Sequence, residues 1–356
     1  GLDLDFDQVD SVRDDVDTGT GVVTPKDGTF APDSQYLSSG VFLQDEIFAL
    51  EPFDVTAGLR YSYFGFSFDD FDSGEETDGS FDALTASLQV ARDVGQGSRV
   101  TATLAQGFRA PNLADLAKNG GFFAGEELAN PDLDPEQSWM AELAWDYVRP
   151  TWSVGTAVYY NEIDDAIGAR LVDEGDPGTP GDEVYQRDNV GELRYAGVEL
   201  LAATKLGGAD SPWSARVVAE SIWGRQFDDT ADPNTGEQPF YDVPARRVPP
   251  FHGQLALRYE PRRGLWRAGW VELSWAWALE QDELNPGDVA DPRIDPDGTD
   301  AWNRVDLDLG GPIGEVGQGS SWWLGLHNLL DERYRVHSSG FDAPGFGVVV
   351  GVRVAI

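Results

Sequence analysis

Apolar residues recur at every second position in many segments of this chain. Residues 139–147 show the pattern clearly, because Trp139, Ala141, Leu143 and Trp145 alternate with polar or small residues. A period of two is typical of a β-strand with one apolar face. About 13 full strands of this kind, and a partial one at residues 1–8, can be traced along the chain. The pattern predicts an all-β protein, and we recognise no capped helix in it.

The predicted strands are joined by two kinds of connection that alternate along the chain. Short turns are expected near residues 50, 95, 150, 208 and 262, and mostly longer loops near residues 74, 120, 176, 238 and 290. A transmembrane barrel has short turns on its periplasmic side and longer loops outside. The alternation therefore favours a transmembrane antiparallel up-and-down β-barrel over a soluble sandwich or propeller.

The composition limits the chemistry that is available to the chain. It contains no cysteine, which excludes disulfides, zinc–thiolate sites and a thiol nucleophile. No apolar run approaches the roughly 18 residues of a membrane helix. The 12 Trp, 11 Tyr and 18 Phe lie towards the predicted strand ends, as an aromatic girdle at a membrane interface would. No motif of a hydrolase, an NTPase or a metalloprotease is present, so we expect no enzyme activity.

The charge is extreme, with a formal net value of −38 and only three lysines. Such a surface repels nucleic acid and anionic surfaces, so no nucleic-acid partner is expected. We interpret the acidity as adaptation to high salt, where repulsion is screened over a Debye length of about 3 Å at 1 M. The alternative is a surface that concentrates cations.

Several phrases resemble those of TonB-dependent outer-membrane receptors. Phe108-Arg109-Ala110-Pro111-Asn112 looks like the FRAP box of that family, and Asn130-Pro131-Asp132-Leu133 looks like its NPDL-type box. NLLDERYRVHSSG (328–340) is similar to the ending of the penultimate strand. GVFLQDEIF, VTAGLRYSYF and AGVELLA are similar to recurring strand phrases, so the resemblance covers nearly the whole chain in family order.

The resemblance implies a fold, a location and a function. Barrels of this family have about 22 strands and a plugged lumen. Residues 1–356 would be the C-terminal part of such a barrel, about 14 strands, with the N-terminal plug domain absent from this chain. The expected location is the outer membrane of a Gram-negative-type bacterium. The implied function is receptor-mediated uptake of a ferric siderophore or another scarce, bulky ligand. The Ton complex would supply the energy through the plug, outer-membrane lipid would surround the barrel, and no cofactor would be needed.

Two other classes of function stay open at this point. One is a passive 14-stranded outer-membrane channel, which would require residues 1–8 to pair with the last strand. The other is a soluble all-β binding protein, which would partition into water without detergent.

Candidate ligand-binding residues lie in the predicted outer loops, around residues 120–127, 173–185, 228–241 and 285–299. Arg109 at its strand end could contact ligand, or it could have a structural role and pair with a carboxylate of the plug or a loop. The structural role is the preferred interpretation. The full set of predicted ligand contacts is Arg109, Asn112, Phe122, Phe123, Glu126, Tyr185, Tyr241 and His337.

Metal and haem sites have little support in the sequence. Haem receptors of the family carry a histidine between the two boxes, and this chain has none there. Its only histidines, His252, His327 and His337, are scattered, and a hydrogen-bonded lumen position is expected for His327. Two partial calcium-loop patterns, at Asp70 and Asp72 and at Asp295 and Asp297, lack the full ligand spacing, so a solvated loop is the preferred interpretation of both.

Overall fold

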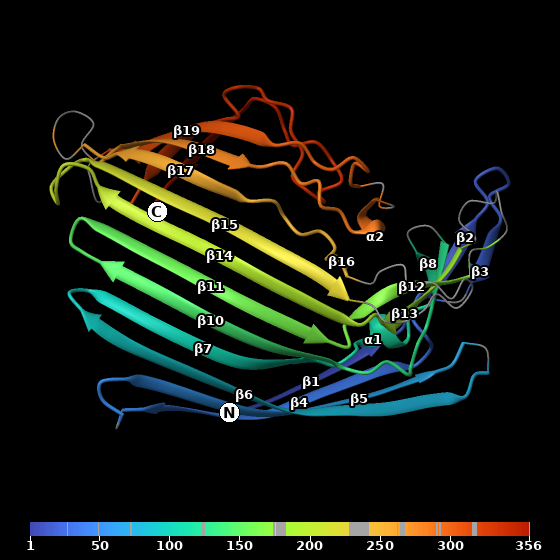
Figure 1. The fold of residues 1–356 in the computed structure, drawn as a ribbon. Helices are drawn as coiled ribbons and strands as arrows, with labels where there is room; N and C mark the ends of the chain where they lie inside the picture. The colour runs from blue at the N-terminus through green and yellow to red at the C-terminus, as the bar shows by residue number, and fades with distance from the viewer. Residues whose placement is uncertain are drawn as a thin grey trace.

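One curved antiparallel sheet dominates the computed structural model (Figure 1). The structure describes residues 1–26, 28–48, 50–71, 73–122, 125–173, 175, 183–227, 242–261, 263, 268–289, 291, 293–314 and 319–355. Fourteen strands follow one another across the sheet in chain order, and β16 (Val243–Pro244) pairs with one of them, β15, off this path. The path is β1 (Leu2–Val9), β4 (Ser34–Ile47), β5 (Asp54–Asp69), β6 (Glu76–Gly95), β7 (Ser98–Arg109), β10 (Glu136–Val148), β11 (Trp152–Asp164), β14 (Glu192–Lys205), β15 (Trp213–Phe227), β17 (His252–Tyr259), β18 (Trp270–Ala278), β19 (Trp302–Pro312), β20 (Ser321–His327) and β21 (Gly347–Arg353).

The register of the sheet puts the apolar positions of neighbouring strands side by side on one face. Leu143 of β10 lies opposite Val158 of β11, and Val158 lies opposite Val198 of β14. These side chains stay 40–52% exposed in the structure. A continuous apolar face of this kind is unfavourable in water and suits the hydrocarbon of a membrane. The predicted all-β, up-and-down fold with about 14 strands is confirmed.

Aromatic side chains border this apolar face at both ends of the strands. Near the short turns, Tyr147 packs against Trp152 with ring centroids 4.6 Å apart, and Trp213 packs against Tyr259 at the same separation. Trp223 borders the other end of β15. An extended strand that is tilted by about 40° places Trp213 and Trp223 roughly 25 Å apart along the barrel axis. That height matches the apolar band of an outer-membrane barrel. No helix in the described part of the chain is long and apolar enough to cross a membrane.

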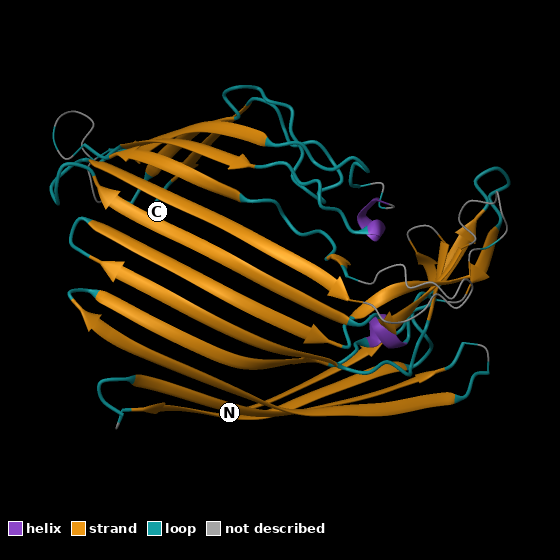
Figure 2. Cartoon of the chain, in the orientation of Figure 1, coloured by secondary structure: helices purple, strands orange, loops and turns teal. Residues whose placement is uncertain are grey.

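Short turns and long loops lie at opposite ends of the sheet, as the sequence predicted (Figure 2). The loop expected near residue 74 is present but short, because β5 ends at Asp69 and β6 begins at Glu76. Phe66 and Phe68 are almost fully buried and continue the inner face of β5 beyond the apolar band. Phe66 packs on Phe81 of β6, so a hydrophobic cluster holds these two strands together outside the membrane.

The long loops carry secondary structure that the sequence did not reveal. Two loops build a four-stranded sheet from β8 (Gly120–Phe122), β9 (Gly125–Leu128), β12 (Ile167–Asp173) and β13 (Glu183–Asn189). β2 (Arg13–Val16) and β3 (Val23–Lys26) form a hairpin in the first loop. The helices are α1 (Leu113–Leu116) and α2 (Pro286–Val289).

The packed core of the molecule lies beneath these loops. Leu116 and Ala117 of the α1 segment are fully buried, and they pack with Phe68 and Leu133. The wall itself is one layer thick, so its interior side chains have no second layer to pack against. Order at the outer end therefore comes from loop packing and ion pairs, which also position the candidate site.

Candidate functional site

Arg109, the last residue of β7, is held by two carboxylates. Its Nη1 lies 2.8 Å from Oδ2 of Asp115 in α1, and its Nε lies 3.1 Å from Oε2 of Glu136 in β10. Both carboxylates are largely buried, with side chains 9% and 17% exposed. Glu136 also accepts a hydrogen bond from the backbone N–H of Ile167. Arg109 therefore ties two outer loops to the wall, which agrees with the structural role that the sequence left open.

Asn112 caps α1, which corrects the expectation that the chain has no capped helix. Its side-chain oxygen accepts from the N–H groups of Ala114 and Asp115, and the Asp115 carboxylate accepts from the Asn112 N–H. This reciprocal pair is a capping box. A four-residue helix is too short to leave a periodic signal, and only the Asn-x-x-Asp spacing could have indicated it.

Glu127 is the most deeply buried carboxylate of the outer loops. Its side chain has no exposed surface, and Oε2 lies 2.6 Å from Nζ of Lys118 while Oε1 lies 2.6 Å from Nε of Arg187. Arg187 belongs to β13, so the carboxylate joins two loops that are distant in the sequence. β9 and β13 also pair directly, in parallel, beside this contact. The described parts of the predicted loops 120–127 and 173–185 thus belong to one ordered body.

Three predicted ligand contacts lie on this loop sheet. Glu126 is exposed on β9 and faces Val184 in the register, while Tyr185 of β13 lies opposite Glu127. Burial raises the pKa of the Tyr185 phenol, with a further contribution from Glu183. Phe122 belongs to β8 at the edge of the same sheet.

Several other predictions fall at the limits of the described chain. Phe123, Tyr241 and Asp72, together with the whole loop 228–241, lie outside the described residues. The structure therefore gathers Arg109, Asn112, Glu126 and Tyr185 on one group of loops.

A second group of loops is organised around Asp288 and Asp291. Asp288 Oδ1 lies 3.0 Å from Nε of Arg246, and its Oδ2 accepts from the backbone N–H of Arg247. Asp291 Oδ2 lies 2.8 Å from Nη2 of Arg247 and 2.7 Å from Nη2 of Arg293. Both carboxylates are almost fully buried. Hydrogen bonds from Arg293, reinforced by Arg247, hold the pKa of Asp291 well below its usual range despite its burial.

His337 belongs to the second group and lies apart from the other predicted contacts in the sequence. Its Nδ1 is 2.9 Å from Oγ1 of Thr299, so it joins the last outer loop to the loop after β18. Burial lowers the pKa of the imidazole, against the opposing effect of Asp288. This contact gives His337 a role in ordering the last outer loop.

The calcium-like patterns form local turns. Asp70 Oδ1 accepts from the N–H and the hydroxyl of Ser73, and Asp295 Oδ1 accepts from the N–H of Asp297. Hydrogen bonds of this kind are typical of solvated Asx turns.

One carboxylate cluster in the described chain has metal-like spacing. Oxygen atoms of Glu162, Asp164 and Glu192 lie within 4.8 Å of one another. Arg194 forms an ion pair with Glu192 and lies 3.6 Å from Glu162, so a guanidinium already compensates part of this charge.

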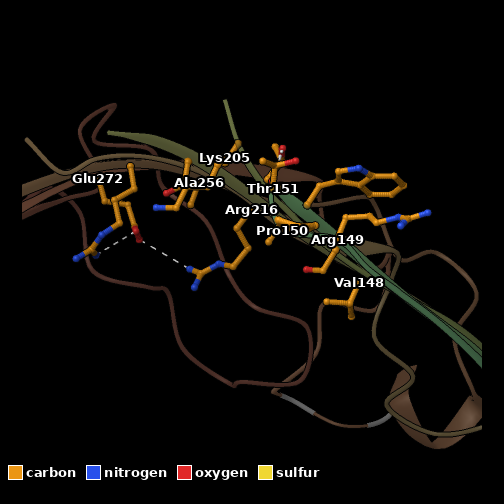
Figure 3. Close-up of a pocket in the computed structure, with 15 residues that line it drawn as sticks. Val148, Arg149, Pro150, Thr151, Lys205, Arg216, Ala256 and Glu272 are labelled. Atoms are coloured by element: carbon orange, nitrogen blue, oxygen red, sulfur yellow. Dashed lines mark hydrogen bonds and ion pairs between the residues drawn. The ribbon is translucent and has the colours of Figure 1, made fainter. Parts of the chain in front are cut away.

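A pocket lies near the short turns, lined by charged side chains of the inner face together with the Arg149–Trp152 turn (Figure 3). Its volume is about 390 Å³, and β11, β14, β15, β17 and β18 contribute to it. Glu272 lies 3.4 Å from Arg258 and 3.8 Å from Arg216, and both contacts are drawn in Figure 3. Lys205 lines the same pocket. These ion pairs run laterally across the inner face, between β15, β17 and β18.

Two histidines occupy the inner face further along the wall. His327 Nε2 lies 3.2 Å from Asp308 Oδ1, and His252 Nε2 lies 3.7 Å from Glu220 Oε2. The expectation of a hydrogen-bonded lumen histidine at position 327 is confirmed. Glu220 also lies opposite Glu199 in the register of β14 and β15, which puts two like charges side by side.

The sequence of this chain matches a known family and a known receptor. Residues 1–329 match the family described as TonB dependent receptor-like, beta-barrel. The ferric enterobactin receptor PirA of Pseudomonas aeruginosa is 26% identical over 195 residues, which is 49% of this chain and 24% of PirA.

Two solved structures share the fold. The copper transporter OprC superposes with a TM-score of 0.74 and 17% identity, over 95% of this chain and 51% of OprC. The hemophore receptor HasR of Serratia marcescens, in complex with its hemophore HasA and heme, gives a TM-score of 0.70 and 15% identity, over 99% of this chain and 54% of HasR.

A membrane-type barrel wall with loops packed at one end defines the class of fold, and the sequence match extends over nearly the whole chain. The chain belongs to the TonB-dependent receptor family. It spans about half the length of the solved receptors that it resembles.

Proposed function

We propose that this chain forms the C-terminal part of the barrel of an outer-membrane receptor. The receptor takes up a scarce, bulky ligand, a ferric siderophore or a similar complex, with energy from the Ton complex. The observation that carries the proposal is the family match over residues 1–329, on a wall whose long loops all lie at one end. The apolar, aromatic-bordered face of the wall supports a location in the outer membrane of a Gram-negative-type bacterium.

The rest of the barrel and the N-terminal plug domain are proposed to lie in a part of the receptor outside this sequence. The coverage of OprC and HasR, near one half in each case, supports this division. In the described part of the chain, no hydrogen bond pairs β1 with β21. Because an unpaired strand edge is strongly unfavourable in hydrocarbon, both edges require partner strands. A closed 14-stranded passive channel would need β1 and β21 to pair, and the structure offers no support for it.

Ligand capture is assigned to the outer loops. Glu126 and Tyr185 lie on the loop sheet, with Arg109 and Asn112 at its base, and His337 belongs to the second loop group. We propose Phe122, Phe123 and Tyr241 as further contacts on the same loops. The role requires no cofactor and no catalytic residue.

The inner wall is proposed to contact the plug. Glu199 and Glu220 lie opposite each other, with His252 3.7 Å from Glu220 and no Arg or Lys in ion-pair contact with either among the described residues; Lys205 has no carboxylate within 4 Å among the same residues. Like charges directly opposite each other on neighbouring strands are destabilising unless a partner compensates them. The plug is the proposed partner, and cations of a salt-rich medium would screen the acidic outer surface.

The decisive experiment measures uptake of a radiolabelled ferric siderophore by cells with and without the receptor. Loss of uptake on receptor deletion, on removal of the Ton complex and on collapse of the proton gradient supports the proposal. Uptake that persists without the Ton complex would instead indicate passive diffusion through a channel.

A further inference from the structure

Basic side chains without a carboxylate partner gather at the short-turn end of the wall. Near the outer end, ion pairs engage Arg109, Lys118, Arg187, Arg225 and Arg304, among others. Among the residues whose side chains the structure describes, five basic side chains have no carboxylate within ion-pair distance, and these five lie near the short turns. These are Arg92, Arg149, Lys205, Arg263 and Arg353.

This distribution is unexpected in a chain with 63 acidic and 25 basic residues. Because carboxylates outnumber basic side chains more than twofold, most basic side chains would be expected to have a carboxylate neighbour. A basic side chain without one therefore needs an explanation. A partner that carries negative charge and approaches from outside the chain would account for this arrangement. At the periplasmic end of a membrane wall, two such partners are the plug and the lipid phosphates.

Aromatic rings direct two of these cations to the lipid side. The guanidinium of Arg92 lies 5.2 Å from the ring centroid of Phe53, and that of Arg149 lies 5.1 Å from the ring centroid of Tyr147. Arg149 Nε also donates to the Tyr147 hydroxyl at 2.7 Å. Both rings lie on the apolar face of the wall. They therefore hold the guanidinium groups at the level of the lipid headgroups, while the rings themselves lie in the membrane interface.

Beside Arg149, the apolar face is hollowed into a shallow groove of about 380 Å³. Arg149 belongs to the turn that leads into Trp152, which lines the groove, and the Arg149 backbone N–H donates to the Trp152 carbonyl. Ala202 and Ala215 place only methyl groups on its floor, between larger neighbours. Those neighbours on the apolar face are Trp152, Val154, Val217 and Leu255.

We propose that this groove seats one acyl chain of a glycerophospholipid in the periplasmic leaflet, with Arg149 on its phosphate. The inference rests on the proposed outer-membrane location. The groove opens on the hydrocarbon-facing side, where an acyl chain is the available occupant, and an anionic headgroup complements a guanidinium that has no carboxylate of its own.

The test uses phosphatidylglycerol with a photoreactive acyl chain, added to the protein in phospholipid nanodiscs, and maps the labelled peptides by mass spectrometry. We expect saturable labelling of β11, β14 and β15 near Trp152, Ala202 and Ala215. Ala215→Leu should fill the groove and remove that labelling. The matched control Ala219→Leu makes the same change on the same face of β15, outside the groove, and should preserve it.

The charge contribution is tested separately. Arg149→Gln should weaken the apparent affinity about fivefold, since one basic residue near a membrane surface contributes about that factor. Arg263→Gln, at another turn, should leave it unchanged. Even labelling around the wall, or labelling that Ala215→Leu does not alter, would contradict the lipid site in the groove but not the outer-membrane location. A chain that partitions into water without detergent would overturn the outer-membrane location, and the groove with it.

Discussion

The carboxylate of Glu127 and the guanidinium of Arg187 meet at 2.6 Å, although they belong to different loops and are separated by 60 residues. Glu127 has no exposed surface, and Arg187 is 28% exposed, so the contact is shielded from solvent. A shielded carboxylate that touches two cations becomes costly to the fold when it is removed, because the cations then lose their partner. The loop sheet should depend on this one side chain.

Glu127→Gln should therefore destabilise the loop sheet by about 3 kcal/mol while leaving the wall intact. The measurement is hydrogen exchange, with faster exchange expected at the amides of β9 and β13 and no change in β10 or β11. Glu126→Gln is the matched control, because its side chain is exposed on the same strand. Equal protection in both variants would show that the ion pairs do not hold the loops.

Arg109 offers a test that separates ligand contact from loop positioning. If the side chain acts through Asp115, then Arg109→Gln and Asp115→Asn should weaken ligand binding by similar factors, and the double variant should be no worse than either. The coupling energy in such a cycle should lie in the range of about 0.5–3 kcal/mol. A loss of affinity in Arg109→Gln that greatly exceeds that of Asp115→Asn would instead assign a direct ligand contact.

The wall could be predicted from the sequence because each of its strands repeats the same signal. Trp139, Leu143 and Trp145 alternate with polar positions over a long span, and the turn at Gly95-Gln96-Gly97 follows from its residue types. Alternation depends only on local sequence, so no knowledge of strand partners is needed. The acidic stretch after Phe68 suggested a longer loop than the structure has, because β6 already begins at Glu76.

The loop architecture could not be predicted because its signals are short and its contacts are non-local. β9 has four residues and pairs with β13, far along the chain, and no period marks either strand. Nothing in the sequence GEEL distinguishes buried Glu127 from exposed Glu126. The same holds for Asp291, whose three arginine partners come from two segments.

Asp291→Asn should loosen the second loop group. The carboxylate is 3% exposed and serves Arg246, Arg247 and Arg293, each of which is only partly shielded. Because these guanidinium groups can regain water, the expected loss is moderate, about 1–3 kcal/mol of local stability. Limited proteolysis between residues 285 and 299 measures it, with Asp295→Asn as an exposed control. Unchanged cleavage in Asp291→Asn would contradict the assignment.

The contact between His337 and Thr299 should make the last loop sensitive to pH. Burial lowers the pKa of His337 from its ordinary value of 6.5, so the opened loop binds a proton more readily than the closed one. The contribution to closure is therefore complete above about pH 6.5 and is lost as the pH falls towards and through the lowered value. The carboxyls of Asp291 and Asp342 have lowered pKa values and stay ionised in this window.

Hydrogen exchange at residues 334–343, compared at pH 7.5 and pH 5, measures this effect. We expect faster opening at pH 5 after correction for intrinsic exchange, and His337→Gln should abolish the difference. Thr299→Val is a second variant, which removes the hydroxyl contact but leaves the titrating group. A pH response that survives in His337→Gln would assign the sensitivity to other groups.

The assignment of the apolar face to the lipid is tested by placing one positive charge on each face of the wall, in two neighbouring strands. Leu200 lies on the apolar face at mid-height of β14, opposite Thr156 and Ala219, whereas Ala157 lies on the inner face opposite Glu199. Leu200→Arg should destabilise the protein in phospholipid vesicles by about 2–4 kcal/mol, the cost of an arginine near the bilayer midplane. Ala157→Arg should be nearly neutral, because its charge points into the lumen beside a carboxylate. Urea unfolding in vesicles measures both, and equal destabilisation would mean that the apolar face is not the one in contact with lipid.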